Sequence, residues 1–128
     1  MAMSLESPLG KFLGHGSAKQ GTDHWWAQKL TAIALVPLTL WFVITLPGLD
    51  IRDLAAARAW VAQPVNAIPL LLLVIAGLYH SLLGLQVIVE DYVHGALKVV
   101  TLLGLQLLHW ALAVAAICAV IVISVGAA

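Results

Sequence analysis

Three long stretches of mostly apolar side chains, residues 26–46, 66–89 and 99–125, limit what this chain can fold into. An α-helix rises 1.5 Å per residue, so about 20 apolar residues cross the hydrocarbon core of a bilayer. Each stretch reaches that length. Of the 128 residues, 62% are hydrophobic and 9% are charged, whereas soluble domains carry roughly 25% charged residues. The sequence therefore predicts an all-α membrane protein with three transmembrane helices.

The chain divides into a polar start and an apolar remainder. Residues 1–24 are predicted to form a cytoplasmic amino-terminal segment, and residues 25–128 a transmembrane anchor domain. The first apolar stretch begins too late and is too long for a cleaved signal peptide. Trp25 and Trp26 are typical of a membrane–water interface, and Asp23 is expected to cap the first helix. The net charge is zero, which indicates no general attraction to nucleic acid.

The connection between the first two spans has a pattern of its own. Between Pro47 and Pro64, apolar and charged residues alternate as on an amphipathic helix that lies on the membrane surface. Asp50 is expected to cap this short helix, and Trp60 to anchor it at the interface. Pro69 is expected in the first turn of the second span, where proline is tolerated.

Basic residues predict the orientation of the chain. Four lysines precede the first span, open it or lie between the second and third spans, and two arginines lie between the first and second spans. Cytoplasmic loops carry an excess of Lys and Arg. We therefore expect the amino terminus inside and the carboxyl terminus outside. The residues concerned are Lys11, Lys19, Lys29 and Lys98 on one side, and Arg52 and Arg58 on the other.

His80 stands in the middle of the second apolar stretch. An ionisable residue at that depth indicates function, and three roles are open: a hydrogen-bonded packing residue, a member of a proton relay, or an axial ligand to haem. By helical rotation Gly77 and Gly84 lie within about 60° of His80. Small residues there would let a flat porphyrin approach the backbone, and neutral imidazole is a standard axial ligand.

His109 lies at a similar depth in the third span. A haem held by both histidines within this chain is therefore one hypothesis. His109 has Leu108 and Trp110 beside it rather than small residues, and we expect it to be a hydrogen-bonded histidine between helices.

Asp91 and Tyr92 end the second span at the inner surface, about 20° from His80 around the helix in the case of Asp91. Both residue types are common at helix ends in the interface. They also suit a quinone site, because a phenol can donate to a quinone carbonyl and an acid can relay a proton. Two roles are also open for Lys29: its amino group reaches the lipid headgroups, or it is the cation that pairs with an anionic cofactor group.

Enzymatic motifs of other kinds are missing from the sequence. There is no glycine-rich phosphate loop, no HExxH and no CxxC, and the single cysteine, Cys118, can form no disulfide within the chain. The sequence therefore does not favour hydrolytic chemistry. The chain also has no cysteine set for an iron–sulfur cluster and no flavin motif.

Together, His80, Gly84 and Asp91-Tyr92 on the second of three spans resemble the smaller membrane-anchor subunit of succinate dehydrogenase, respiratory complex II. Residues 16–35, GSAKQGTDHWWAQKLTAIAL, are similar to the amino-terminal stretch of alphaproteobacterial members. The resemblance covers roughly residues 14–95 by motif and the remainder by hydropathy. It implies a location in the bacterial inner membrane.

The resemblance also implies roles for individual residues. His80 would be one axial ligand of a b-type haem, whose other ligand comes from a second anchor subunit. Tyr92 would hydrogen-bond a carbonyl of ubiquinone, or of menaquinone, with Asp91 beside it. Lys29 stands where the family often has an arginine near the haem propionates, and lysine cannot form the bidentate fork of arginine. No role follows for His24, His94 or His109.

The implied partners are a flavoprotein, an iron–sulfur subunit and the second anchor subunit. The chain would then be a non-autonomous subunit that docks the soluble pair and helps pass electrons to quinone. Two rivals remain open: the anchor of a quinol:fumarate reductase, in which the same parts run in reverse, and a haem-free structural or assembly protein in which His80 only packs.

Overall fold

The computed structural model describes residues 18–50 and 52–126, and of residues 18–21 only the backbone. Within these residues the chain is entirely helical apart from short connections. The elements are α2 (Ala18–Thr45), the 3₁₀ turn η1 (Leu46–Gly48), α3 (Leu54–Ala62), α4 (Pro64–Tyr92) and α5 (Gly95–Gly126). The predicted fold class is confirmed.

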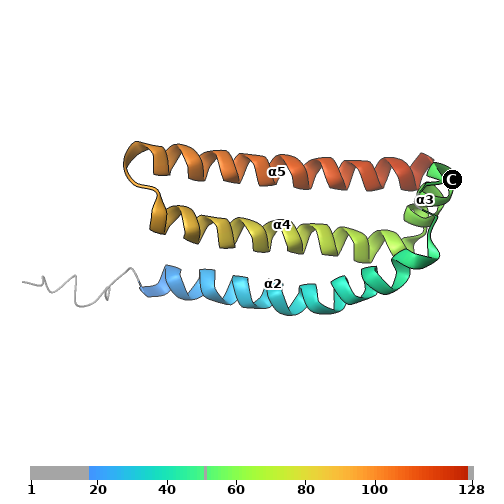
Figure 1. Cartoon of the computed structure of the whole chain (residues 1–128), viewed down its shortest axis with the longest axis horizontal. Helices are drawn as coiled ribbons and strands as arrows, with labels where there is room; N and C mark the ends of the chain where they lie inside the picture. The colour runs from blue at the N-terminus through green and yellow to red at the C-terminus, as the bar shows by residue number, and fades with distance from the viewer. Residues whose placement is uncertain (1–17, 51, 127–128) are drawn as a thin grey trace, which may run out of the picture.

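The three long helices lie side by side in one layer, with α4 in the middle (Figure 1). α4 packs against α2 on one side and α5 on the other, and within the described part of the chain α2 and α5 do not contact each other. The start of α2, the end of α4 and the start of α5 share one end of the layer, and α3 lies at the opposite end (Figure 1). Asp91, Tyr92 and Lys98 therefore lie at the end where α2 begins.

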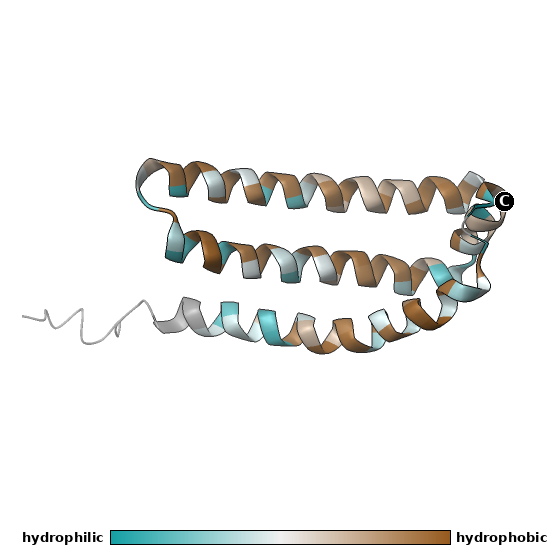
Figure 2. Cartoon of the chain, in the orientation of Figure 1, coloured by the Kyte–Doolittle hydropathy of each residue, from teal (hydrophilic) through white to brown (hydrophobic). Residues whose placement is uncertain are grey.

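All three long helices have the length and composition of membrane spans: Thr22–Gly48, which runs from α2 into η1, Pro64–Tyr92 and Gly95–Gly126. Hydrophobic residues cover most of their length, and hydrophilic residues lie mainly toward the helix ends, with isolated ones in the middle of α4 and α5 (Figure 2). Few side chains are buried within the chain itself, and many large apolar ones are exposed. A layer one helix thick has no enclosed core, so lipid or other subunits must cover its two faces.

Two expectations about helix ends are wrong. Asp23 does not cap the first helix, because α2 already begins at Ala18 and runs through Gly21. Pro69 does not lie in the first turn of the second span, because α4 begins at Pro64. Pro64 occupies the first helical turn, where the missing N–H costs nothing, and Pro69 is held inside the helix. Figure 1 draws α2 curved, and Pro37 lies within it, as expected of a proline that removes one backbone hydrogen bond.

The short helix α3 is capped by Asp53, not by the expected Asp50. The side chain of Asp53 accepts a hydrogen bond from the amide of Ala55 at 2.8 Å, whereas Asp50 accepts one from Arg52 in the preceding turn at 3.0 Å. Trp60 of α3 stacks on Trp41 of α2 with ring centroids 5.8 Å apart. The stacking holds α3 against α2 at the end of the layer opposite the start of α2.

The tight connection between α4 and α5 depends on one glycine and one lysine. Gly95 has φ +68°, a left-handed conformation that a residue with a Cβ adopts only at a cost. Lys98 donates from Nζ to the carbonyl oxygen of Glu90 at 3.1 Å. A cation at the carboxyl end of α4 satisfies a free carbonyl and complements the helix dipole. Together they hold the start of α5 against the end of α4.

Candidate functional site: a histidine held between two helices

His80 lies partly buried near the middle of α4, on the side that faces α2. Both of its ring nitrogens have partners on α2. Nδ1 lies 2.9 Å from Oγ1 of Thr31, and Nε2 lies 3.3 Å from Nε2 of Gln28. The imidazole is therefore fixed in orientation by side chains 49 and 52 residues away in sequence.

The polar side chains on this part of α2 include more than the two atoms that contact His80. His24 and Gln28 are one helical turn apart on α2, and each has one polar atom that is buried without a hydrogen-bond partner among the described residues: Nε2 of His24 and Oε1 of Gln28. A buried polar atom without a partner costs about 1–3 kcal/mol. Two such atoms on one helix face indicate a place where a further polar group would be stabilised.

Gly77 and Gly84 both face α2. A Cβ added at Gly84 would lie 3.6 Å from Nε2 of Gln28, and one at Gly77 would lie 3.9 Å from Cδ2 of Leu35. These are ordinary van der Waals distances, so both glycines bring the two helices close together. Gly84 also leaves the space that the carboxamide of Gln28 occupies on its way to His80.

His109 is a hydrogen-bonded histidine between helices, as expected. It is 8% exposed. Its Nδ1 donates to the carbonyl oxygen of Leu105 at 2.8 Å, and its Nε2 lies 3.4 Å from the hydroxyl of Ser81 on α4. His80 is held by α2 on one side of α4, whereas His109 is held by α5 and Ser81. The two imidazoles do not face a common space, which speaks against a haem ligated by both within this chain.

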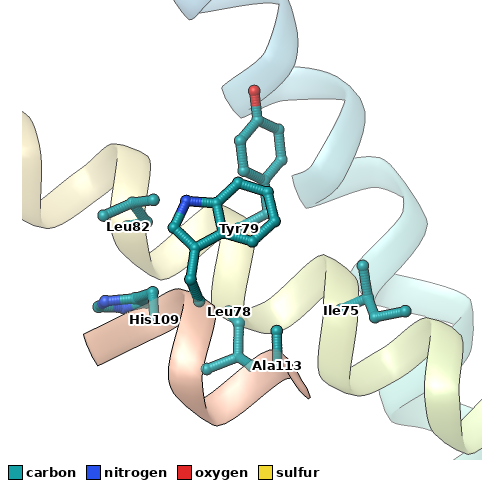
Figure 3. Close-up of a pocket in the computed structure, with 7 residues that line it drawn as sticks. Ile75, Leu78, Tyr79, Leu82, His109 and Ala113 are labelled. Atoms are coloured by element: carbon teal, nitrogen blue, oxygen red, sulfur yellow. The ribbon is translucent and has the colours of Figure 1, made fainter. Parts of the chain in front are cut away.

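A small apolar pocket lies between α4 and α5 beside His109 (Figure 3). Its volume is about 170 Å³, below the roughly 300–1,000 Å³ of sites that enclose a ligand of ordinary size. Its walls carry almost no polar surface, and it does not include His80. Its lining residues are Ile75, Leu78, Tyr79, Leu82, His109, Trp110 and Ala113.

Asp91 and Tyr92 are the last residues of α4 and are both exposed, Tyr92 to 80%. The preceding Glu90 is tied to its own helix, because Gln86 donates to its Oε1 at 2.9 Å. The structure thus places a phenol and a carboxylate at the end of α4, open to an approaching ligand. They share this helix with His80 but lie about three turns from it.

Lys29 extends along α2 toward its amino-terminal end. Its Nζ lies 4.5 Å from the centroid of the Trp25 ring, a cation–π contact at an exposed site. This is the position of a lysine that reaches toward the interface, and it neighbours Gln28 in sequence.

Gln28, Thr31 and Ser81 were not predicted as partners of the two histidines. A signal was present for the first two, because His24, Gln28 and Thr31 recur at spacings of four and three residues and therefore lie on one face of the helix. Among the described residues no group of three or more His, Cys, Asp or Glu side chains could hold a metal ion. Any iron bound at His80 would therefore need ligands from elsewhere.

The fold and the site define a class: a multi-pass membrane protein with a histidine fixed between two spans and an acid–tyrosine pair at the end of one. Comparison with known proteins identifies the family. Residues 3–127 match the succinate dehydrogenase/fumarate reductase transmembrane subunit family. The chain is 39% identical over 93 residues to the succinate dehydrogenase hydrophobic membrane anchor subunit of Rickettsia bellii, covering 73% of this chain and 74% of that one.

Two further relatives carry similar descriptions. The hydrophobic membrane anchor subunit of Paracoccus denitrificans succinate dehydrogenase is 32% identical over 117 residues, or 89% of this chain and 88% of that one. The membrane anchor subunit of Reclinomonas americana is 29% identical over 96 residues, 66% of this chain and 73% of that one. No solved structure matches significantly. This chain belongs to the succinate dehydrogenase/fumarate reductase transmembrane subunit family, as a membrane anchor subunit of the succinate dehydrogenase complex.

Proposed function

We propose that this anchor subunit supplies His80 as one axial ligand of a b-type haem shared with a second anchor subunit. We further propose that Asp91 and Tyr92 form part of the site where ubiquinone, or menaquinone, is reduced. The soluble flavoprotein and iron–sulfur subunits would dock at the same end of the layer. The observation that carries the proposal is the partly buried imidazole of His80, held in one orientation in the middle of a membrane span by the hydroxyl of Thr31 at Nδ1.

The residues around His80 suit a haem. Imidazole is a standard axial ligand, and His109, which lies at similar depth, is engaged by the backbone of its own helix α5 and by Ser81. Buried atoms of His24 and Gln28 lack partners among the residues described, which favours a further polar group beside them. Gly77 and Gly84 keep α4 free of bulk along this face. When bound, haem would supply a one-electron carrier within the membrane.

Lys29 is proposed as a cation for a haem propionate. Its exposed amino group over Trp25 lies near the start of α2, where rotation about its side-chain bonds gives it a wide reach. A lysine makes a point contact with a carboxylate, unlike the two-point fork of arginine. The contribution of Lys29 to propionate binding is accordingly smaller than that of an arginine would be.

The quinone proposal rests on the end of α4. The phenol of Tyr92 is 80% exposed and can donate a hydrogen bond to a quinone carbonyl. Asp91 precedes it and can pass a proton from water to the reduced quinone. Quinone reduction consumes two electrons and two protons, so a donor phenol and a hydrated carboxylate match its needs.

The location proposed is the bacterial inner membrane, with residues 1–24 in the cytoplasm and the carboxyl terminus in the periplasm. The distribution of Lys and Arg supports this orientation. In this orientation Asp91, Tyr92 and Lys98 would lie on the cytoplasmic side, where the soluble subunits would deliver electrons.

The test is a reduced-minus-oxidised spectrum of the affinity-purified complex with His80→Ala. Loss of the b-type α-band at unchanged flavin content is the expected result. His109→Ala is the matched control, because it removes the histidine at similar depth in α5 without touching the α2–α4 interface, and it should keep the band. A normal spectrum in His80→Ala would remove His80 as a ligand.

One observation favours a second candidate, the haem-free structural anchor: both ring nitrogens of His80 already have hydrogen-bond partners. In that case the complex from native membranes would contain flavin but no b-type haem. A fumarate reductase anchor would show the same haem and subunits as the main proposal. Turnover in both directions with the native quinone separates the two enzymes.

A further inference from the structure

Gln28 and Thr31 both reach His80 from a single face of α2. They are three residues apart, which places them side by side on the helix. One contacts Nε2 of His80 and the other contacts Nδ1. Because the two nitrogens have different chemical roles, the two contacts have different consequences.

The hydroxyl hydrogen of Thr31 is directed to the backbone of α2. Its Oγ1 lies 2.8 Å from the carbonyl oxygen of Ala27 and 3.0 Å from that of Gln28. Thr45 makes the same pair of backbone bonds at 2.9 and 3.1 Å, so this is the ordinary state of a threonine in this helix. A hydroxyl has one hydrogen and two lone pairs. Thr31 therefore accepts a hydrogen bond from the Nδ1–H of His80.

The proton on Nδ1 leaves the lone pair of the ring on Nε2. The amide of Gln28 donates to that lone pair at 3.3 Å, which is long against the usual 2.9–3.0 Å for N–H···O bonds. The other end of the carboxamide, Oε1, is buried and has no partner among the described residues. Gln28 is thus weakly bonded on one side and unsatisfied on the other, and it is easily displaced.

We propose that Thr31 is a positioning residue that orients His80 and keeps its Nε2 available to haem iron, and that Gln28 competes with the iron for the same lone pair. The inference rests on the proposed function of His80. An outer hydrogen bond to the second nitrogen of a metal-bound histidine fixes its tautomer and typically contributes 10–100-fold to metal affinity. Iron held at Nε2 would replace the hydrogen bond from Gln28, and this exchange would transfer no electron or proton.

The test uses the whole detergent-purified complex and measures the rate at which haem passes to excess apomyoglobin. Thr31→Val keeps the shape of the side chain and removes the acceptor, and it should speed haem loss about 10-fold or more. It should also shift the low-temperature electron paramagnetic resonance signal of the haem, because the ring is no longer held at one angle. Thr31→Ser should restore both properties. Thr45→Val is the matched control and should change neither.

For Gln28→Ala we expect no increase in the rate of haem loss. Removing the competing amide should slow haem loss or leave it unchanged, although the same face of α2 is altered. If Gln28→Ala and Thr31→Val destabilise the haem equally, the two residues merely pack the interface and the inference is overturned. An unchanged rate and resonance signal in Thr31→Val would also overturn it.

These outcomes are distinct from failure of the proposed function. If His80→Ala keeps a normal b-type spectrum, the haem proposal itself fails. If His80→Ala loses the spectrum while Thr31→Val behaves as wild type, His80 remains the ligand and only the role of Thr31 is wrong. Flavin content reports assembly in every variant.

Discussion

Oγ1 of Thr31 lies 2.9 Å from Nδ1 of His80, so a hydroxyl in the first half of α2 fixes a ring in the middle of α4. The contact crosses an interface between two membrane spans, where no water competes for the hydrogen bond. It links the amino-terminal region of the chain, with its tryptophans and Lys29, to the histidine on which the proposed chemistry depends. The α2–α4 interface is thus both a packing surface and the support of the site.

Substitution of Gly84 should test how much room this interface holds. A Cβ at this position would meet Nε2 of Gln28 at an ordinary 3.6 Å, so Gly84→Ala should assemble normally and keep its haem. Gly84→Leu should push α2 away and lower the haem-to-flavin ratio at least several-fold. Gly104→Leu, whose Cβ meets nothing within 4 Å, is the control within this chain. Equal haem content in both Gly84 variants would contradict the prediction.

His109 should matter for stability rather than for haem. His109→Ala removes a hydrogen bond to the α5 backbone and the contact with Ser81, and it leaves a cavity between α4 and α5. Polar contacts between membrane helices contribute about 0.6 kcal/mol on average, and the cavity adds to this. We expect a lower temperature of thermal inactivation for the complex with an intact b-type spectrum. Loss of the spectrum at unchanged thermal stability would instead make His109 a ligand.

The number and type of the helices were predictable because each span is long and apolar, and His80 stood out because it interrupts such a span. The partners of His80 were not predicted. The spacing of His24, Gln28 and Thr31 marks one face of α2, but the sequence does not say which helix that face meets. Only the folded structure brings Gln28 and Thr31 to a residue about 50 positions away. The same limit applies to Ser81 and His109.

The cap of α3 shows the limit at short range. Asp50 and Asp53 both accept a backbone hydrogen bond two residues ahead, and a sequence offers no means to tell a turn of this kind from a helix start. The chain uses the first aspartate for the turn and the second for the helix.

The glycines beside His80 carry a similar ambiguity, because small residues suit a porphyrin and a close helix contact equally well.

Asp53→Ala should loosen α3. Loss of an N-cap costs about 1 kcal/mol, which corresponds to roughly 5-fold faster amide hydrogen exchange in the first turn of the helix. Asp50→Ala removes only the bond to Arg52 and should leave exchange in α3 unchanged. Hydrogen exchange measured by mass spectrometry on the purified complex checks both. Faster exchange in Asp50→Ala alone would show that the first aspartate controls the helix.

The orientation of the layer can be measured with introduced cysteines. In a Cys118→Ser background, Ala59→Cys places a thiol on α3 and Ala96→Cys places one at the start of α5, at opposite ends of the layer. A membrane-impermeant maleimide added to spheroplasts should label the Ala59→Cys variant, and the Ala96→Cys variant only after permeabilisation. The reverse pattern would place Asp91 and Tyr92 away from the soluble subunits and would remove the basis of the quinone proposal.

Tyr92→Phe tests the quinone site most directly. The change removes one exposed hydroxyl and leaves the ring, so assembly and haem should be unaffected. A hydrogen bond of about 1–2 kcal/mol to the quinone carbonyl predicts a 5–30-fold fall in kcat/KM for quinone, while succinate oxidation with an artificial acceptor of the iron–sulfur subunit stays normal. Tyr79→Phe is the control. Tyr79 is the other tyrosine of α4, lies in mid-span and is 47% exposed, and its substitution should change neither rate. A parallel fall of both activities in Tyr92→Phe would mean that Tyr92 supports docking of the soluble subunits instead of binding quinone.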